Sequence, residues 1–153
     1  MAENLSSRPV VSCRMCGSDS LHRYLDMGRT PLANAYLDPG SSDGPEFKEE
    51  LCLQLCRDCG LSQLTQVVHP DRMFRHYLYV SSTTETIRGH FAEFAATAAR
   101  AAGAKPGDLA LDIASNDGTL LSAFAAVGLR AIGVDPAENL AKEAHAKGRT
   151  TWC

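Results

Sequence analysis

Two cysteine pairs with the same spacing constrain this chain more than any other feature of its sequence. The first is Cys13-Arg-Met-Cys16-Gly17 and the second is Cys56-Arg-Asp-Cys59-Gly60. A C-x-x-C turn presents two thiolates to one metal ion, and the glycine after it lets the turn close without a Cβ clash. Two such turns complete a tetrahedral zinc site with no open position, which is typical of a structural metal. We therefore predict zinc bound by Cys13, Cys16, Cys56 and Cys59; the alternative is two separate redox or buried cysteine pairs.

The composition favours a metal over disulfides. The chain of 153 residues is 44% hydrophobic and 22% charged, with a net charge of -3, which gives no support for a nucleic-acid or anionic-membrane surface. Its start has no apolar stretch of the kind that a signal peptide needs, and no run approaches the roughly 20 apolar residues of a membrane span. We expect a cytoplasmic, reducing location with neither a nucleic-acid nor a membrane partner, and hence thiols that are free to bind a metal.

The residues before the second cysteine pair predict a strand that keeps Cys52 away from the metal. Residues 50–56 alternate, with leucines at positions 51, 53 and 55 on one face. Cys52 shares the other face with Cys56, but four residues along a strand place the two roughly 13 Å apart. We therefore predict that Cys52 is a half-buried residue outside the site. Residues 1–12 are expected to be a loose lead-in.

The second informative stretch is a short apolar strand followed by a polar turn and the start of a helix. Asp112 lies at the end of the strand, and the turn contains Ala114, Asn116 and Gly118. Asn and Gly tolerate backbone conformations that most residues resist, and the carboxyl end of a parallel strand is the usual place for a nucleotide-type cofactor. The fingerprint G-x-G-x-x-G is absent, so the turn alone does not name a cofactor, and an ordinary strand-turn-helix is the alternative.

A second strand with a terminal carboxylate extends this pattern. Residues 131–134 form a short apolar strand that ends in Asp135, and a helix over 138–147 and an extended segment from 149 follow. This β-α-β-α-β succession predicts a parallel sheet with right-handed crossovers. Asp135 then lies at the tip of the second strand, where a carboxylate can accept hydrogen bonds from both hydroxyls of a ribose. The combination favours a nucleotide cofactor at this edge of the sheet.

The segment before the parallel sheet concentrates hydrogen-bonding side chains. Tyr77, Tyr79, Ser81 and Ser82 lie in a short link between two predicted helices. Ser82-Thr-Thr-Glu85 has the pattern of a capping box for the second of these helices. The link is therefore either a helix cap with two packed tyrosines or a binding segment.

Taken in order, these motifs resemble those of the SAM-dependent C-methyltransferases of deoxysugar biosynthesis. The matching stretches are C-R-x-C-G, Gly28-x-x-Pro31-Leu-Ala-Asn34, C-x-x-C-G-L, Met73-Phe through Ser82, residues 112–121 and Gly133-Val-Asp135-Pro. The resemblance implies an α/β fold class, with a small zinc-ribbon-like N-terminal domain followed by the first β-α-β-α units of a Rossmann-like methyltransferase domain. It divides the chain into a zinc-binding domain over 1–68, a helical connector over 69–105 and the start of a SAM-binding domain over 106–153.

The resemblance also implies cofactors, a substrate and residue roles. The cofactors are zinc and S-adenosyl-L-methionine (SAM), and the substrate is a nucleotide-linked 4-keto deoxysugar that is methylated beside its ketone. Tyr79 matches a tyrosine in the family's active site, where its hydroxyl would bind the developing oxyanion or orient the sugar. The residues expected to bind SAM are Asp112, Ala114, Asn116, Gly118, Asp135, Ser81 and Ser82. The oligomeric state is left open.

The sequence departs from the family pattern in two ways. The general methyltransferase loop is acid-x-Gly-x-Gly-x-Gly, whereas this chain has Ala114 and Asn116 at the first two glycine positions. The resemblance covers only the N-terminal portion of the family, and none of the 5 histidines matches the family's main catalytic base. We therefore expect a truncated methyltransferase domain without methyl-transfer activity of its own. The alternative is a non-catalytic zinc-ribbon module that serves in binding or docking.

Overall fold

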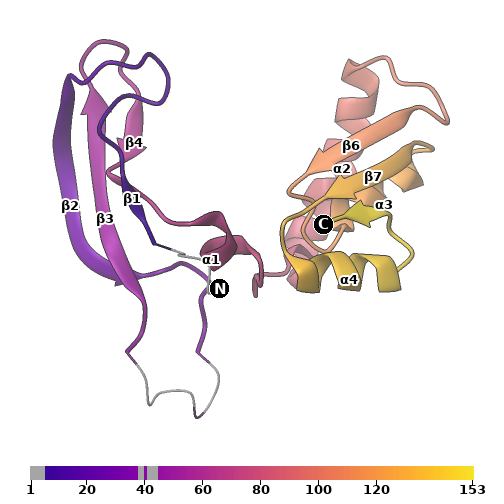
Figure 1. Cartoon of the computed structure of the whole chain (residues 1–153). Helices are drawn as coiled ribbons and strands as arrows, with labels where there is room; N and C mark the ends of the chain where they lie inside the picture. The colour runs from indigo at the N-terminus through magenta and orange to yellow at the C-terminus, as the bar shows by residue number, and fades with distance from the viewer. Residues whose placement is uncertain (1–5, 38–39, 41–44) are drawn as a thin grey trace. The chain divides into compact units, whose positions relative to one another are not determined.

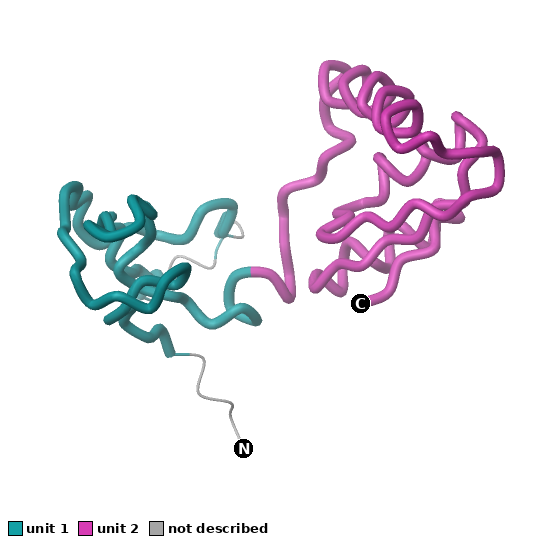
Figure 2. Tube along the Cα trace, turned by 90° about the horizontal axis from the view of Figure 1, so that it is seen from above, with its two compact units in different colours: residues 1–73 teal, residues 74–153 magenta. Residues whose placement is uncertain are grey.

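The computed structural model describes residues 6–37, 40 and 45–153. The structure is mixed α/β and divides into two compact units, residues 1–73 and 74–153 (Figure 2). Within the described residues, no helix is both long enough and apolar enough to cross a membrane.

The first unit is built on a three-stranded antiparallel sheet in the order β2-β3-β4, with a separate ribbon of β1 and β5 (Figure 1). The strands are β1 (Arg8–Pro9), β2 (Leu21–Pro31), β3 (Lys48–Cys56), β4 (Ser62–Leu64) and β5 (Gln66–Val67). The expected loose lead-in is therefore wrong at β1, because this segment pairs with β5. The first five residues of that lead-in lie outside the described part.

The buried face of this sheet is the face without the leucines. Cys52, Gln54 and Cys56 of β3 are 1%, 5% and 0% exposed, whereas Leu55 on the opposite face is 37% exposed. The side-chain amide of Gln54 donates to the carbonyl of Val10 (2.9 Å), so the segment after β1 covers the cysteine face. The strand predicted over 50–56 is confirmed. Cys52, however, is fully buried rather than half-buried, because it lies on this covered face.

The second unit contains a three-stranded parallel sheet in the order β6-β7-β8. Its elements are η1 (Ser81–Thr83), α2 (Glu85–Ala101), β6 (Leu109–Ile113), α3 (Thr119–Ala126), β7 (Arg130–Val134), α4 (Glu138–Ala146) and β8 (Thr151–Trp152), and the short helix α1 (Pro70–Phe74) precedes them (Figure 1). Helix α3 packs on β6 and β7, and α4 packs on β8. The predicted parallel β-α succession is confirmed and is consistent with a partial Rossmann-like fold.

One face of the parallel sheet is largely exposed. Leu109, Leu111 and Ile113 of β6 are 55%, 58% and 76% exposed. The register continues this face from Ile113 through Val134 to Trp152. Parallel sheets normally have both faces covered, and their strands are apolar for that reason. The strand composition therefore fits a sheet that is covered on a second face as well.

Helix α2 begins later than its expected cap. Thr84 has an extended backbone, and its hydroxyl oxygen accepts a hydrogen bond from the amide of Ile87 (3.3 Å). Ser82 lies in the separate 3-10 turn η1, and Glu85 forms an ion pair with Arg88. The predicted capping box that starts at Ser82 is therefore wrong, because the 3-10 turn ends before the helix starts.

Gly133, in the fourth position of β7, has no room for a side chain. A Cβ atom at this position would lie 2.3 Å from Ser115 Oγ and 2.9 Å from Thr151 Oγ1. Both hydroxyls are buried, and neither has a hydrogen-bond partner among the described residues. The strand thus fits under the turn after β6 only because residue 133 is a glycine.

The substitution Gly133→Ala is expected to destabilise the second unit by about 1–3 kcal/mol, because the added methyl group must displace Ser115 or Thr151. The control is Gly89→Ala in α2, where a Cβ would have nothing within 4 Å and alanine should stabilise the helix by about 0.5–1 kcal/mol. Urea unfolding followed by the fluorescence of Trp152, the single tryptophan, measures both variants. A Gly133→Ala protein as stable as the parent would contradict the close packing of Gly133 against Ser115 and Thr151.

Candidate functional site

The two C-x-x-C-G turns adopt matching conformations. The amide of Gly17 donates to the carbonyl of Cys13 (2.9 Å), and the amide of Gly60 donates to the carbonyl of Cys56 (2.9 Å). Gly17 and Gly60 have φ angles of 78° and 77°, in the left-handed region that favours glycine. The glycine that follows each cysteine pair thus lets the chain close a tight knuckle around the sulfur atoms.

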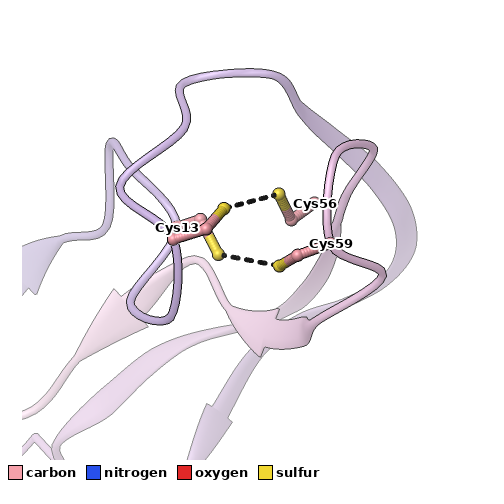
Figure 3. Close-up of side chains that lie close together, drawn as sticks. Cys13, Cys56 and Cys59 are labelled. Atoms are coloured by element: carbon pink, nitrogen blue, oxygen red, sulfur yellow. Dashed lines mark hydrogen bonds between the residues drawn. The ribbon is translucent and has the colours of Figure 1, made fainter.

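The two knuckles bring four sulfur atoms together (Figure 3). Cys13 Sγ lies 3.5 Å from Cys59 Sγ, and Cys16 Sγ lies 3.6 Å from Cys56 Sγ. All four sulfurs lie within 4.8 Å of one another, and Cys52 is outside the group. A tetrahedral zinc ion with Zn–S bonds of about 2.3 Å separates its ligand atoms by about 3.8 Å. The arrangement therefore fits a closed four-cysteine zinc centre.

The electrostatics of the cluster also favour a bound cation. A hydrogen bond from the backbone of Cys16 is the main cause that lowers the pKa of Cys13 to about 6. The backbone amide of Leu61 lowers the pKa of Cys59 as well, but the thiols of Cys13 and Cys16 outweigh it and raise that pKa to about 12. One thiolate therefore forms readily and opposes the ionisation of its neighbours. A divalent cation removes this opposition by neutralising the thiolates.

Buried glutamines support the first knuckle. Gln63 of β4 is 8% exposed; its side-chain oxygen accepts from the amide of Arg14 (3.0 Å), and its nitrogen donates to the carbonyl of Ser12 (3.2 Å). Gln54 of β3 holds Val10 in a similar way. Sequence reasoning missed both residues, because a glutamine in an alternating strand looks like an ordinary surface residue.

In the second unit, the turn after β6 contains three residues with left-handed backbone. Ala114, Asn116 and Gly118 have φ angles of 65°, 54° and 73°. The amides of Ala114 and Ser115 both donate to the carbonyl of Val134 (2.8 and 3.2 Å), which ties the turn to the end of β7. The turn thus follows the path of a glycine-rich loop although it contains a single glycine.

Asp135, at the end of β7, organises this turn. Its Oδ2 atom accepts from the amide of Asn116 (2.7 Å), and its Oδ1 atom accepts from the amide of Ala137 (2.8 Å). The residue is 6% exposed, yet each carboxylate oxygen keeps a second lone pair for a ligand hydroxyl. Asp112 is half-buried, and burial together with the charge of Asp135 raises its pKa.

Asp117 is a second buried carboxylate in the turn, and sequence reasoning missed it. Its Oδ1 atom accepts from the hydroxyl of Thr119 (2.7 Å), and its Oδ2 atom lies 3.4 Å from Lys147 Nζ and 3.7 Å from Arg149 Nη1. Burial raises the pKa of Asp117, but hydrogen bonds from Ser82 and Thr119 and the charge of Lys147 outweigh it, so the pKa is lowered. The carboxylate therefore stays ionised and joins the turn to the segment between α4 and β8.

Gly118 is required at the start of α3 for two reasons. Its φ angle is left-handed, and a Cβ at this position would lie 2.8 Å from Arg149 Cδ. Arg149 in turn donates to the carbonyl of Asp117 (2.6 Å) and to the hydroxyl of Ser122 (2.7 Å). The guanidinium therefore lies closely against the turn, where a larger residue than glycine would displace it.

The link over residues 75–82 is held beside the same strand ends. Asn116 accepts from the amide of Ser81 (2.8 Å) and donates to the carbonyl of Tyr79 (3.0 Å). Asn139 of α4 accepts from the amide of Tyr77 (3.0 Å) and donates to its carbonyl (2.8 Å). The structure thus gathers the residues predicted to bind SAM, and the backbone of Tyr79, around the carboxyl ends of β6 and β7. Their roles stay predictions.

Comparison with known proteins agrees with this arrangement. Residues 13–74 match the family described as "Putative zinc binding domain". The chain is also 38% identical over 144 residues to the C-methyltransferase NovU of Streptomyces niveus, an alignment that covers 94% of this chain and 34% of the relative. The chain thus spans about a third of the length of the relative that it matches. Residues 13–74 are thus similar to this zinc-binding domain family, and the chain is similar to part of a C-methyltransferase.

Proposed function

We propose that the chain combines a structural zinc centre with the SAM-binding part of a C-methyltransferase that acts on a nucleotide-linked keto-deoxysugar. The observation that carries the proposal is the turn after β6, where Asn116 and Asp135 close a left-handed loop at the carboxyl ends of two parallel strands. Nucleotide-type cofactors bind at this position in open α/β sheets. The 38% identity to a C-methyltransferase supports the reaction class.

The zinc centre is proposed to hold the first unit together rather than to take part in chemistry. Cys13, Cys16, Cys56 and Cys59 supply four ligands, which leaves no open coordination position for a substrate. The two knuckles come from distant parts of the sequence, so the ion would crosslink β3 and the segment after β1. Such a site contributes directly to folding free energy.

SAM, when bound, supplies an electrophilic methyl group on a sulfonium. In the proposed site, the carboxylates of Asp112 and Asp135 accept hydrogen bonds from ribose hydroxyls, and the left-handed turn lets the backbone approach the cofactor closely. The hydroxyl of Tyr79 would hydrogen-bond the ketone oxygen of the sugar, where negative charge develops during the reaction, or would orient the sugar. Aligning that carbon with the methyl group is the main contribution of such a site.

The 153 residues by themselves are not expected to transfer a methyl group. The exposed apolar face of β6, formed by Leu109, Leu111 and Ile113, lies on a type of sheet that is normally covered on both sides. A turnover assay with SAM and a keto-sugar nucleotide tests this expectation. Clear formation of a methylated product would show that the chain is catalytically sufficient.

One zinc ion per chain is expected by elemental analysis of the purified protein. The variants Cys13→Ser and Cys59→Ser should each lose the zinc and destabilise the first unit, because a serine hydroxyl is a poor zinc ligand. Cys153→Ser is the matched control, since Cys153 is exposed and lies outside the cluster. A parent protein without zinc, or a Cys59→Ser variant that retains it, would contradict the assignment.

Zinc binding should release protons at pH 7 and weaken as the pH falls. The pKa of Cys59 is raised to about 12 and that of Cys16 is also raised, so both thiols carry protons that the ion must displace. Cys13, with its pKa lowered to about 6, is already largely ionised. Calorimetry in buffers of different ionisation enthalpy should give about two or more protons per zinc ion. Binding without proton release would show that the thiols are not the ligands.

SAM should bind to the parent protein, and Asp135→Ala should weaken that binding at least about tenfold, because hydrogen bonds to a charged group are lost. Glu93→Ala, which removes an exposed carboxylate from α2, is the control. Isothermal titration measures the affinity, and the fluorescence of Trp152 reports whether each variant is folded. A parent that holds zinc but has no affinity for SAM would overturn the methyltransferase proposal and favour a non-catalytic zinc module.

A further inference from the structure

Two asparagines hold the link over residues 75–82 by its backbone. The side chain of Asn139 hydrogen-bonds both the amide and the carbonyl of Tyr77. The side chain of Asn116 hydrogen-bonds the carbonyl of Tyr79 and the amide of Ser81. These are alternate residues, and Val80 between the last two has extended φ and ψ angles of -116° and 123°. In an extended chain the polar groups of alternate residues face the same side. The two side-chain amides therefore pair with the link as a neighbouring strand would.

The two asparagines lie where the first two strands of the parallel sheet end. Asn116 belongs to the turn after β6, and Asn139 belongs to the first turn of α4, directly after β7. The link, which carries Tyr79, is thus fastened across the carboxyl ends of both strands. Tyr79 itself is 41% exposed, so its ring is not fixed by burial. Its placement depends on how firmly its backbone is held.

Asn116 connects this link to the residue that is proposed to bind the ribose. Its own amide donates to Asp135 Oδ2 (2.7 Å), while its side chain bonds the backbone of Tyr79 and Ser81. Its φ angle of 54° is one that asparagine tolerates better than most residues. Glycine would satisfy the backbone angle equally well, but it would leave Tyr79 and Ser81 without these partners. The side-chain amide therefore has a purpose that the backbone conformation alone does not explain.

We propose that Asn116 is a positioning residue that holds the link over residues 75–82 against the turn after β6, so that SAM binding and the placement of the Tyr79 ring are coupled. The coupling runs through Asn116, whose backbone amide donates to the carboxylate of Asp135 and whose side-chain amide donates to the carbonyl of Tyr79. The coupling rests on the proposed function, because that function identifies the ligand as SAM. The contact between Asn116 and Ser81 does not rest on it and can be measured without any ligand.

The experiment compares Asn116→Gly, which keeps the left-handed angle and removes the amide, with Asn116→Asp, which keeps an acceptor for Ser81 and removes the donor to Tyr79. Lys142→Ala, an exposed position of α4, is the control. The full chain is labelled with 3-fluorotyrosine, and Tyr79→Phe assigns the Tyr79 signal in the fluorine spectrum. Hydrogen exchange of the Ser81 amide is measured without ligand, and SAM is then added.

In the parent and the control, SAM should shift the Tyr79 fluorine signal. In Asn116→Gly the Ser81 amide should exchange about five- to tenfold faster, because one hydrogen bond is lost, and Asn116→Asp should restore most of its protection. Asn116→Gly keeps the left-handed backbone through which the turn is expected to approach SAM, so SAM should still bind, with an affinity lowered by no more than about fivefold. The Tyr79 signal of that variant should no longer respond.

Five results would overturn the proposal. The first is a Tyr79 signal in Asn116→Gly that shifts with SAM as in the parent. The second is a folded Asn116→Gly protein that no longer binds SAM, because the side chain of Asn116, rather than the backbone of its turn, would then hold the cofactor. The third is loss of folding in both Asn116 variants, which would make the residue structural. The fourth is a parent that does not bind SAM, which would remove the proposed function and the coupling together. The fifth is unchanged Ser81 exchange in Asn116→Gly, which would show that the side chain of Asn116 does not hold Ser81.

Discussion

The first unit has almost no apolar core, and this constrains everything else about it. Its buried described residues are Cys13, Cys52, Gln54, Cys56, Gln63 and Thr65. A unit of this size gains little from hydrophobic burial in any case, and here the buried face carries thiols and amides while Leu55 points to solvent. The binding of structural zinc contributes about 10–16 kcal/mol to the folding of zinc-finger peptides at neutral pH, which is enough to replace a core. A sheet that buries its cysteines and glutamines rather than its leucines is therefore understandable as a scaffold around a metal site.

The second unit depends on a different constraint, because it holds a tight turn of polar residues at the edge of an apolar sheet. Two buried carboxylates hold this turn through different kinds of partner. Asp135 accepts backbone amides from Asn116 and Ala137 and so fixes the path of the turn. Asp117 faces the cations of Lys147 and Arg149 and so fixes the turn against the next crossover. Both charges are compensated within the protein, as buried charges must be.

Local chemistry made part of this structure predictable from the sequence, and distant contacts decided the rest. The knuckles follow from the spacing of cysteine and glycine alone, and the parallel sheet follows from apolar runs that alternate with helical periodicity. By contrast, Asn139 and Gln63 bond to residues 62 and 49 positions away, which no local pattern reveals. The predicted start of α2 is wrong for the same reason, since Asn116 bonds Ser81 in the 3-10 turn that precedes Thr84. Side-chain amides are versatile, so their partners are visible only in three dimensions.

The replacement of glycines in the turn after β6 changes the mechanics of the loop rather than its path. A left-handed angle costs an ordinary residue about 1–2 kcal/mol. Ala114 bears such a cost, and Asn116 bears a smaller one because asparagine tolerates this angle better. Asn116 offsets it with side-chain bonds to Tyr79 and Ser81, and Ala114 offsets it with its amide bond to Val134. Residues other than glycine also lose less conformational entropy on folding. The loop is therefore expected to be stiffer than a glycine-rich one before any cofactor arrives, which reduces the ordering cost of binding and passes any movement of the loop directly to the Tyr79 segment.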